Sequence, residues 1–574
     1  MTISALQKAR ASYEPKVPAV LKGNVKAVEG KYTQSVADQE KIKQLFPHTY
    51  GIPVVTFEKS LETPRGQAMN VGVILSGGQA PGGHNVIAGL FDGIKAIHDD
   101  SRLFGFILGP EGLIKHKYME LTKTIIDDYR NTGGFDMIGS GRTKLETTAQ
   151  FEKGLEVLRK ENIKALVIIG GDDSNTNACV LAEYFKSVDA GVQVIGCPKT
   201  IDGDLKNEQI ETSFGFDTAC KVYSELIGNI QRDCNSARKY WHFIKLMGRS
   251  ASHIALECAL QTHPNICIIS EEVEAKEKTL DIIVNEIAEI VAARAEQGMN
   301  FGTLLIPEGL VEFIPDMKRL MAELDGYFRV DEHKEDFKAV NRSKQIGYIT
   351  NKLTKDNAYL YSTLPENVAR QLLLERDDHG NFPVSAIETE KLLAEMVASR
   401  LEEWVMSGRR LQRWISKDEK GDKKYKGKFT PQVHFFGYEG RCAAPSNYDA
   451  DYCYSLGYTA SCLIRAGKTG YIASVRNTTA PAEQWIAGGI PITMMMNMEL
   501  RDHVWKPVIQ KALVKLDGAP FKTLAENRDV WAVTTDYVYP GPIQYFGTPE
   551  VCDQPTITLR LEQGINAGRD ACDP

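Results

Sequence analysis

Short runs of apolar residues recur along the chain, and most of them end in glycine or polar residues. Runs of this kind occupy residues 71–75, 165–169 and 192–196. A continuous apolar run bounded by glycines is typical of a strand that is buried on both faces of a parallel sheet. The same pattern predicts further strands at residues 103–108, 137–139, 243–247, 266–270, 303–307 and 433–437.

Helical patterns separate many of these predicted strands. The clearest pattern covers residues 279–297, where apolar residues recur at helical spacing and Gly298 follows. Strands that alternate with helices predict an α/β fold with parallel sheets. Between about residues 312 and 430 the pattern is mainly helical and charged, and the α/β alternation then returns.

The length of 574 residues exceeds what one hydrophobic core holds, so at least two domains are expected. We expect a first α/β domain at residues 68–235 and a second one formed by residues 236–311 with a return segment at 431–500. The remaining parts are expected to be an N-terminal extension, a mainly helical insertion and a C-terminal segment, at residues 1–67, 312–430 and 501–574.

Composition and charge narrow the class of protein. A formal net charge of −7 argues against nucleic acid or an anionic membrane as a partner. Eleven cysteines without a C-x-x-C pair indicate free thiols in the cytoplasm and argue against a zinc site. No apolar stretch approaches the ~18 residues that a membrane span needs. The charged run at residues 417–428 is interpreted as a solvated loop, with nucleic-acid binding or regulation as the alternative.

Two acidic pairs follow neighbouring predicted strands: Asp172 with Asp173, and Asp202 with Asp204. The carboxyl ends of such strands form the edge where open α/β sheets bind ligands. Like charges at ~4 Å repel by about 4 kcal/mol at an effective dielectric near 20, so cations are expected beside these acids. Mg²⁺ held by Asp172, together with the nearby Lys199, would supply the positive charge that phosphoryl transfer needs. The alternative is that the aspartates only form turns.

A glycine-rich loop and two basic residues are candidates for binding phosphate. Residues 76–85 connect a predicted strand to a helix, and glycines there let backbone N–H groups approach a phosphate closely. The loop lacks the Lys-Ser/Thr pair of a Walker A motif, and packing alone could also explain it. Arg142 and Lys144 follow another predicted strand and can bind phosphate oxygens.

Further polar residues follow the later predicted strands. Arg249 can bind a phosphate through two parallel hydrogen bonds, and Glu308 can accept hydrogen bonds from sugar hydroxyls. Tyr438 and Arg441 follow the last clear strand. Such residues at several successive strand ends predict a pocket for a polyanion.

The motifs at residues 198–205 and 247–249 resemble those of the phosphofructokinase family, and the resemblance covers about residues 68–500. Within the family, the chain is similar to the long, pyrophosphate-dependent branch. The resemblance implies two Rossmann-like, three-layer α/β/α domains with parallel-rich sheets, an active site in the cleft between them, and a helical insertion. It also implies reversible, Mg²⁺-dependent transfer of a phosphoryl group from pyrophosphate to the 1-hydroxyl of fructose 6-phosphate.

The resemblance implies a role for each matching residue. Asp202 would accept the proton of the sugar hydroxyl, and Asp204 would support it. Asp172 would be the Mg²⁺ site, and Gly78 would contact pyrophosphate. Arg249, with its basic neighbours, would screen the charge that develops during transfer. Fructose 6-phosphate would be bound by residues of four segments: Thr200, Ile201, Asp202, Met247, Gly248, Arg249, Glu308, Tyr438 and Arg441.

Four more residues concern the donor and the assembly. ATP-using relatives usually have glycine in place of Asp173, where a carboxylate crowds and repels the α-phosphate of a nucleotide. Lys199 adds positive charge for the compact pyrophosphate. Lys239 and Tyr240 resemble the segment that reaches into the site of a neighbouring subunit, which implies a homodimer or a larger homo-oligomer.

Two alternative functions are also compatible with the sequence. One is an ATP-dependent 6-phosphofructokinase, which differs in the phosphoryl donor. The other is a non-catalytic regulatory subunit, which would be expected to lose the catalytic acids or the phosphate-binding arginine. Asp172, Asp202, Asp204 and Arg249 are all present in this chain.

Overall fold

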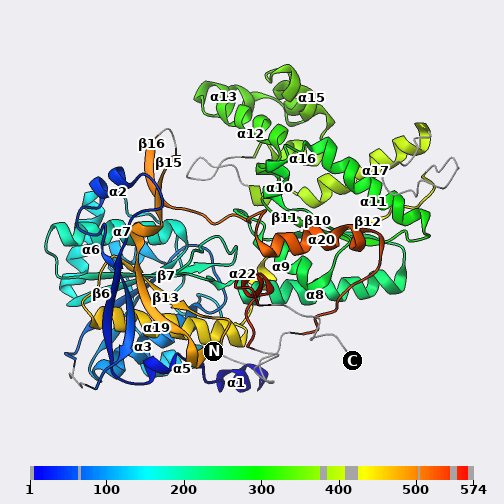
Figure 1. Cartoon of the computed structure of the whole chain (residues 1–574). Helices are drawn as coiled ribbons and strands as arrows, with labels where there is room; N and C mark the ends of the chain where they lie inside the picture. Colours follow the sequence, from blue (N-terminus) through cyan, green and yellow to red (C-terminus); the bar gives the residue numbers. More distant parts are fainter. Residues whose placement is uncertain are drawn as a thin grey trace. The chain divides into compact units, whose positions relative to one another are not determined.

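Figure 1 shows the computed structural model of the chain. It describes residues 5–61, 66–374, 384–407, 425–501, 504–542 and 553–565. The chain divides into two compact units. Unit 1 comprises the described parts of residues 1–222, 438–512 and 543–560, and unit 2 those of residues 223–437, 513–542 and 561–574. Both units contain a sheet with parallel strands and covering helices, which confirms the predicted α/β class.

Unit 1 is built on a sheet whose described strands have the order β1-β2-β14-β13-β7-β6-β3-β4-β5, with β8 paired to β7. The strands β13, β7, β6, β3 and β4 run parallel, and antiparallel pairs lie at both edges. The strands are β1 (Val25–Tyr32), β2 (Pro53–Lys59), β3 (Asn70–Leu75), β4 (Arg102–Phe106), β5 (Tyr118–Glu120), β6 (Ile163–Gly170), β7 (Gln193–Thr200), β8 (Phe214–Gly215), β13 (Tyr471–Arg476) and β14 (Ile486–Pro491).

Helices cover both faces of this sheet. Figure 1 shows α6 and α7 on one face and α3 and α19 on the other, so unit 1 has three layers. A hairpin of β15 (Met496–Arg501) and β16 (Val504–Ile509) contacts α2 and α7. The helices are α1 (Ala5–Ala11), α2 (Gln39–Leu45), α3 (Gly83–Ile97), α4 (Pro110–Ile114), α5 (Lys123–Tyr129), α6 (Thr148–Lys160), α7 (Asp172–Ser187), α18 (Tyr438–Arg441) and α19 (Asn447–Arg465), with 3-10 turns η1 (Ala19–Lys22), η5 (Ala482–Gln484) and η6 (Ile492–Met495).

Unit 2 contains a parallel sheet whose described strands have the order β10-β11-β9-β12. These strands are β9 (Trp241–Leu246), β10 (Ile266–Cys267), β11 (Gly302–Pro307) and β12 (Pro431–Phe436). Helix α17 packs on β9 and β12, and α9 packs on β10 and β11. Among the helices, α8 (Phe216–Ala237) begins in unit 1 and continues into unit 2, and α9 (His253–Thr262), α10 (Ser270–Ala275), α11 (Leu280–Glu296) and α20 (Ala519–Val533) follow. The short helix α22 (Ile557–Glu562) lies near the C-terminus.

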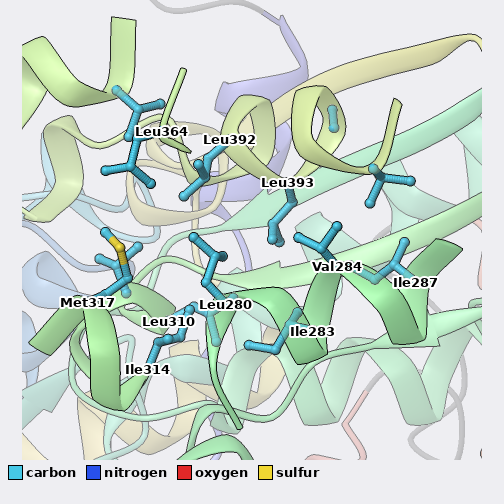
Figure 2. Packing of buried hydrophobic residues seen from close by; sticks show 14 of the residues in the cluster. Leu280, Ile283, Val284, Ile287, Leu310, Ile314, Met317, Leu364, Leu392 and Leu393 are labelled. Atoms are coloured by element: carbon cyan, nitrogen blue, oxygen red, sulfur yellow. The ribbon is translucent and has the colours of Figure 1, made fainter. Parts of the chain in front are cut away.

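The predicted helical insertion is a set of helices of different lengths, of which α17 packs on α11. Its elements are η2 (Leu310–Glu312), α12 (Pro315–Phe328), α13 (Asp331–Ala339), η3 (Arg342–Lys344), α14 (Gln345–Thr350), α15 (Lys355–Thr363), α16 (Glu366–Gln371), η4 (Val384–Ala386) and α17 (Thr389–Ser407). Figure 2 shows Val284 and Ile287 of α11 beside Leu393 of α17 in one buried apolar cluster. The insertion therefore shares a core with the α/β part of unit 2.

The clearest predicted helix is present as α11. Thr279 caps it by accepting a hydrogen bond from the N–H of Ile282, and Gly298 follows its end with a positive φ of 76°. The prediction of a strand at residues 137–139 is wrong, because these residues form a turn. In its place Gly141 forms an isolated parallel bridge with Ser76.

One predicted segment packs in the other unit, and the N-terminal extension joins the same sheet. The return segment was expected in the second domain, but its strands β13 and β14 extend the sheet of unit 1, where β13 pairs with β7. The N-terminal extension supplies β1 and β2 to the same sheet. Most of the charged run at residues 417–428 lies outside the described residues. Within the described ranges, no helix has the length and apolar character needed to cross a membrane.

Candidate active site

Two acidic turns meet at one edge of the sheet in unit 1. The neighbouring strands β6 and β7 run parallel, with Gly170 opposite Pro198, so both chains leave the sheet at the same edge. Asp172 lies in the first turn of α7, directly after β6. Asp202 and Asp204 lie in the turn after β7, where the N–H of Asp202 donates to Oγ1 of Thr200 over 3.0 Å.

Burial perturbs the titration of two groups in this cluster. Asp204 is 7% exposed, and its burial, followed by the charges of Asp202 and Asp172, raises its pKa to about 7. Lys199 is 6% exposed, and its burial, followed by the charge of Arg441, lowers its pKa to about 8. Both groups therefore exchange protons near neutral pH, as groups in active sites often do.

Three cations stand beside the three carboxylates of Asp172, Asp202 and Asp204. Besides Lys199, Arg441 Nη2 lies 3.9 Å from Asp202 Oδ1, and Lys511 Nζ lies 3.7 Å from Asp172 Oδ2. Lys511 belongs to the C-terminal segment, to which the sequence assigned no function. Its neighbourhood in the sequence offered no strand-end motif, so only the folded chain brings it to the acids.

The glycine-rich loop approaches the same cations. Gly77 has a positive φ of 84°, and its N–H donates to the carbonyl of Gly141 over 2.9 Å. A Cβ at Gly78 would lie 2.5 Å from Nη1 of Arg441 and 4.0 Å from Nη2 of Arg142. A side chain at Gly78 would thus displace the arginine that also faces Asp202. The loop leaves space for basic groups to converge beside its backbone.

Asp173 and Lys144 form an ion pair, with Lys144 Nζ 3.4 Å from Asp173 Oδ1. Asp173 is about half exposed and lies beside Asp172 at the start of α7. Its carboxylate is favoured there by the positive end of the helix dipole as well as by Lys144. Of the nearby predicted residues, Ile201 is buried and Thr200 is half-buried.

Arg441 lies with the residues expected to bind the donor. Its Nη1 donates to the carbonyl of Gln79 over 3.3 Å, within the glycine-rich loop. The resemblance had assigned Arg441 to the sugar phosphate, and that assignment stays a prediction. Tyr438 begins α18 and is 69% exposed.

A second group of predicted residues lies in unit 2, where the parallel strands β9 and β11 end side by side. The N–H of Gly248 donates to Oε2 of Glu308 over 2.9 Å, and Gly248 has a positive φ of 134°. Arg249 reaches Glu312 with Nη2 and Nε over 3.3 and 3.4 Å. Met247 is buried between these strand ends. An exposed guanidinium beside a buried carboxylate can bind a phosphate and a hydroxyl of one sugar phosphate.

Lys239 and Tyr240 lie at the opposite end of β9. They precede the strand, whereas Met247 follows it, so the six residues of β9 (about 20 Å) separate the two groups. Lys239 is exposed, and its ammonium lies 5.0 Å from the centre of the Tyr240 ring.

A cavity of about 250 Å³ lies elsewhere in unit 2, between residues 265–269, α11 and α20. Isoleucines and the ion pair of Glu272 with Arg528 line it. None of the predicted site residues lines this cavity.

The carboxylates at the acidic edge of unit 1 fit a magnesium ion that takes most of its ligands from the substrate and water. Among the described residues there is no group of three or more His, Cys, Asp or Glu that could hold a metal ion. Mg²⁺ in phosphoryl-transfer sites usually takes one or two carboxylates and fills its other positions with phosphate oxygens and water. A single carboxylate such as Asp172 is enough for a site of that kind. A site built from protein ligands alone would need several more.

Comparison with known proteins identifies the family. A phosphofructokinase family model matches residues 70–350. A relative from Porphyromonas gingivalis, named pyrophosphate–fructose 6-phosphate 1-phosphotransferase, is 64% identical over 98% of this chain and 100% of its own length. The chain belongs to the phosphofructokinase family. The resemblance in the sequence motifs is thereby confirmed.

A second relative of this chain carries the same name. It comes from Treponema pallidum (strain Nichols) and is 51% identical over 100% of this chain and 99% of its own length. Among solved structures, a pyrophosphate-dependent phosphofructokinase from Nitrosospira multiformis matches with a TM-score of 0.52 and 16% identity, over 86% of this chain and 98% of that one. At that identity the structural match shows the shared fold alone.

Proposed function

We propose that this phosphofructokinase transfers a phosphoryl group from pyrophosphate to the 1-hydroxyl of fructose 6-phosphate, giving fructose 1,6-bisphosphate and phosphate. One observation carries the proposal: three carboxylates and three cations converge at one sheet edge in a chain that is 64% identical to a relative of that name. One phosphoanhydride is exchanged for one phosphate ester, so the reaction is expected to run in both directions.

In the proposed reaction, Asp202 accepts the proton of the sugar 1-hydroxyl as its oxygen attacks the terminal phosphorus of pyrophosphate. A positioned carboxylate performs this task in other kinases. Asp204 is held partly protonated by its burial, and a neutral neighbour lessens the repulsion between Asp202 and the phosphate oxygens. The expected contribution of such a base is about 10²- to 10⁴-fold in rate.

The donor is proposed to bind beside the same turns. Lys199 and Arg441 lie among the acids and beside the glycine-rich loop, where they can neutralise the oxygens of the diphosphate. Asp172 would hold Mg²⁺, which would supply positive charge to stabilise the leaving phosphate. Asp173 narrows the space next to the donor and repels a third phosphate.

Arg249 and Glu308 are proposed to bind fructose 6-phosphate. The exposed Arg249 offers its guanidinium to the 6-phosphate in exchange for Glu312, and the buried Glu308 fixes the backbone of Gly248. The two strand ends are joined by a direct hydrogen bond, so the turn that carries Arg249 is preorganised for its ligand.

We also propose a homo-oligomer in which Lys239 and Tyr240 serve the site of a neighbouring subunit. Their place at the far end of β9 supports this, because Met247 and Arg249 lie about 20 Å away in the same unit. Mixing an Asp202→Ala protein with a Lys239→Ala protein should then restore part of the activity that each lacks alone. Sedimentation of the purified chain at the mass of one subunit would contradict the proposal.

The catalytic assignment is tested by Asp202→Asn, which keeps the size of the side chain and removes its basicity. We expect turnover to fall by about 10²- to 10⁴-fold, while the KM values of both substrates change little. Circular dichroism and thermal unfolding should match those of the unchanged protein. Undiminished turnover would show that Asp202 is not the proton acceptor.

A further inference from the structure

The segment that follows the hairpin of unit 1 lies across both acidic turns. In Figure 1 the hairpin β15–β16 stands near α2 and α7, and contacts join β16 to α7. The N–H of Ile509 donates to Oγ1 of Thr176 in α7 over 3.3 Å. Three residues later, the N–H of Ala512 donates to the carbonyl of Asp204 over 2.7 Å. The backbone on either side of Lys511 is therefore tied to the two elements that carry the acids.

The ammonium group of Lys511 lies close to the same acids. Its Nζ lies 3.7 Å from Oδ2 of Asp172, and its charge also acts on Asp204. Lys511 is 37% exposed, whereas Lys199 is buried. Of the two lysines, Lys511 is the one that an entering anion meets at the solvent side of the cluster.

The charge balance shows why this lysine matters. Asp172, Asp202 and Asp204 bring up to three negative charges, and Lys199, Arg441 and Lys511 bring three positive ones. Whenever Asp204 is ionised, the edge without Lys511 would carry an excess of negative charge, although it has to accept a ligand that is itself strongly anionic. At an edge that is partly shielded from solvent, an ammonium a few ångströms from the ligand's phosphates interacts with them strongly enough to decide whether the ligand binds.

We propose that Lys511 is a pyrophosphate-binding residue: its ammonium pairs with Asp172 in the absence of ligand and contacts the diphosphate when it enters. This inference rests on the proposed function and adds to it a donor contact from the C-terminal segment. The hairpin that precedes Lys511 acts as the support that holds the ammonium over the acids. The sugar phosphate does not depend on this residue, because its binding residues belong to other strand ends.

The test compares Lys511→Met with Lys511→Arg, and uses Lys506→Met as the matched control. Lys506 lies on β16, opposite Glu499 in the hairpin, so its substitution removes the same charge from the strand that precedes Lys511. In Lys511→Met we expect the KM for pyrophosphate to rise by about 10- to 100-fold, the loss typical of a hydrogen bond between charged groups. The KM for fructose 6-phosphate should stay unchanged, Lys511→Arg should recover most of the affinity, and Lys506→Met should behave like the unchanged protein.

A second measurement does not depend on turnover. Pyrophosphate added without metal should raise the midpoint of thermal unfolding of the unchanged protein and of Lys511→Arg. The rise should be much smaller in Lys511→Met. An unaltered KM for pyrophosphate, or an equal rise in the KM of both substrates, would overturn the inference. If Lys511→Met does not fold, Lys511→Gln gives the same comparison. If the unchanged protein shows no turnover with pyrophosphate, the proposed function fails, while the thermal shifts still decide whether Lys511 binds the diphosphate.

Discussion

Asp173 is the side chain that we propose selects the phosphoryl donor. It lies beside Asp172 and pairs with Lys144 over 3.4 Å. Under the proposed function, its carboxylate would repel the α-phosphate of a nucleotide. In Asp173→Gly we expect the ratio of kcat/KM for ATP over pyrophosphate to rise by about tenfold, which corresponds to ~1.4 kcal/mol. The measurement is the rate with each donor at fixed fructose 6-phosphate. An unaltered ratio would show that neither charge nor crowding at this position sets the donor.

Lys199 should make donor binding dependent on pH. Burial lowers the pKa of its ammonium to about 8, so the charged form is present below pH 8 and is lost as the pH rises through 8. The KM for pyrophosphate should therefore increase above pH 8 in the unchanged protein. Lys199→Arg keeps its charge in this range, because the guanidinium titrates above pH ~12, and should lack the increase. The ionisation of pyrophosphate itself changes equally with pH for both proteins. Equal pH profiles of the KM for pyrophosphate would therefore contradict this role of Lys199.

The residues of the site were predictable to different degrees. Asp172 and Asp202 follow apolar strands, and Lys199 lies near the end of one. Charged residues at the end of a buried strand indicate a ligand-binding edge from the sequence alone. Lys511 carries no such signal, because it follows a hairpin whose contacts with α7 are made only in the folded chain. Sequence patterns report the local element, and a residue brought in by tertiary packing escapes them.

At the scale of elements, the turn after β11 has to fit against the turn after β9. A Cβ at Gly309 would lie 2.0 Å from the carbonyl oxygen of Arg249, so this glycine is needed for the close approach of the two backbones. We expect Gly309→Ala to displace Arg249 and raise the KM for fructose 6-phosphate by about 10- to 100-fold, with little effect on pyrophosphate. Steady-state kinetics with each substrate varied in turn checks this.

The matched control is Gly326→Ala in α12, where an added Cβ would meet nothing within 4 Å. Alanine is the better helix former there, so this protein should be slightly more stable and equally active. Equal kinetic effects of the two substitutions would mean that the fit of the turns does not position Arg249.

The predicted elements mostly exist where the pattern is periodic. The helix at residues 279–297 is present as α11, because a threonine cap, an apolar stripe and a terminal glycine agree. The strand expected at residues 137–139 is absent, since so short a run ending in glycine satisfies a turn as well as a strand. Short runs do not distinguish the two without knowledge of their neighbours.

At the scale of the whole molecule, the assignment of segments to sheets depended on pairings far apart in the sequence. The return segment extends the sheet of unit 1 through β13 beside β7, and the N-terminal β2 pairs with β14. Nothing in the local pattern of a strand names its partner, so the order of strands could not be derived from the sequence. The α/β class and the existence of a helical insertion could be, because they follow from the alternation of elements.

The proposal that pyrophosphate is the phosphoryl donor is tested most directly by an assay of the purified chain. With Mg²⁺ and fructose 6-phosphate present, formation of fructose 1,6-bisphosphate is measured with pyrophosphate and, separately, with ATP. The proposed function predicts rapid turnover with pyrophosphate, much slower turnover with ATP, and the reverse reaction when fructose 1,6-bisphosphate and phosphate are supplied. A clear preference for ATP, or no turnover by the chain alone with either donor, would contradict it.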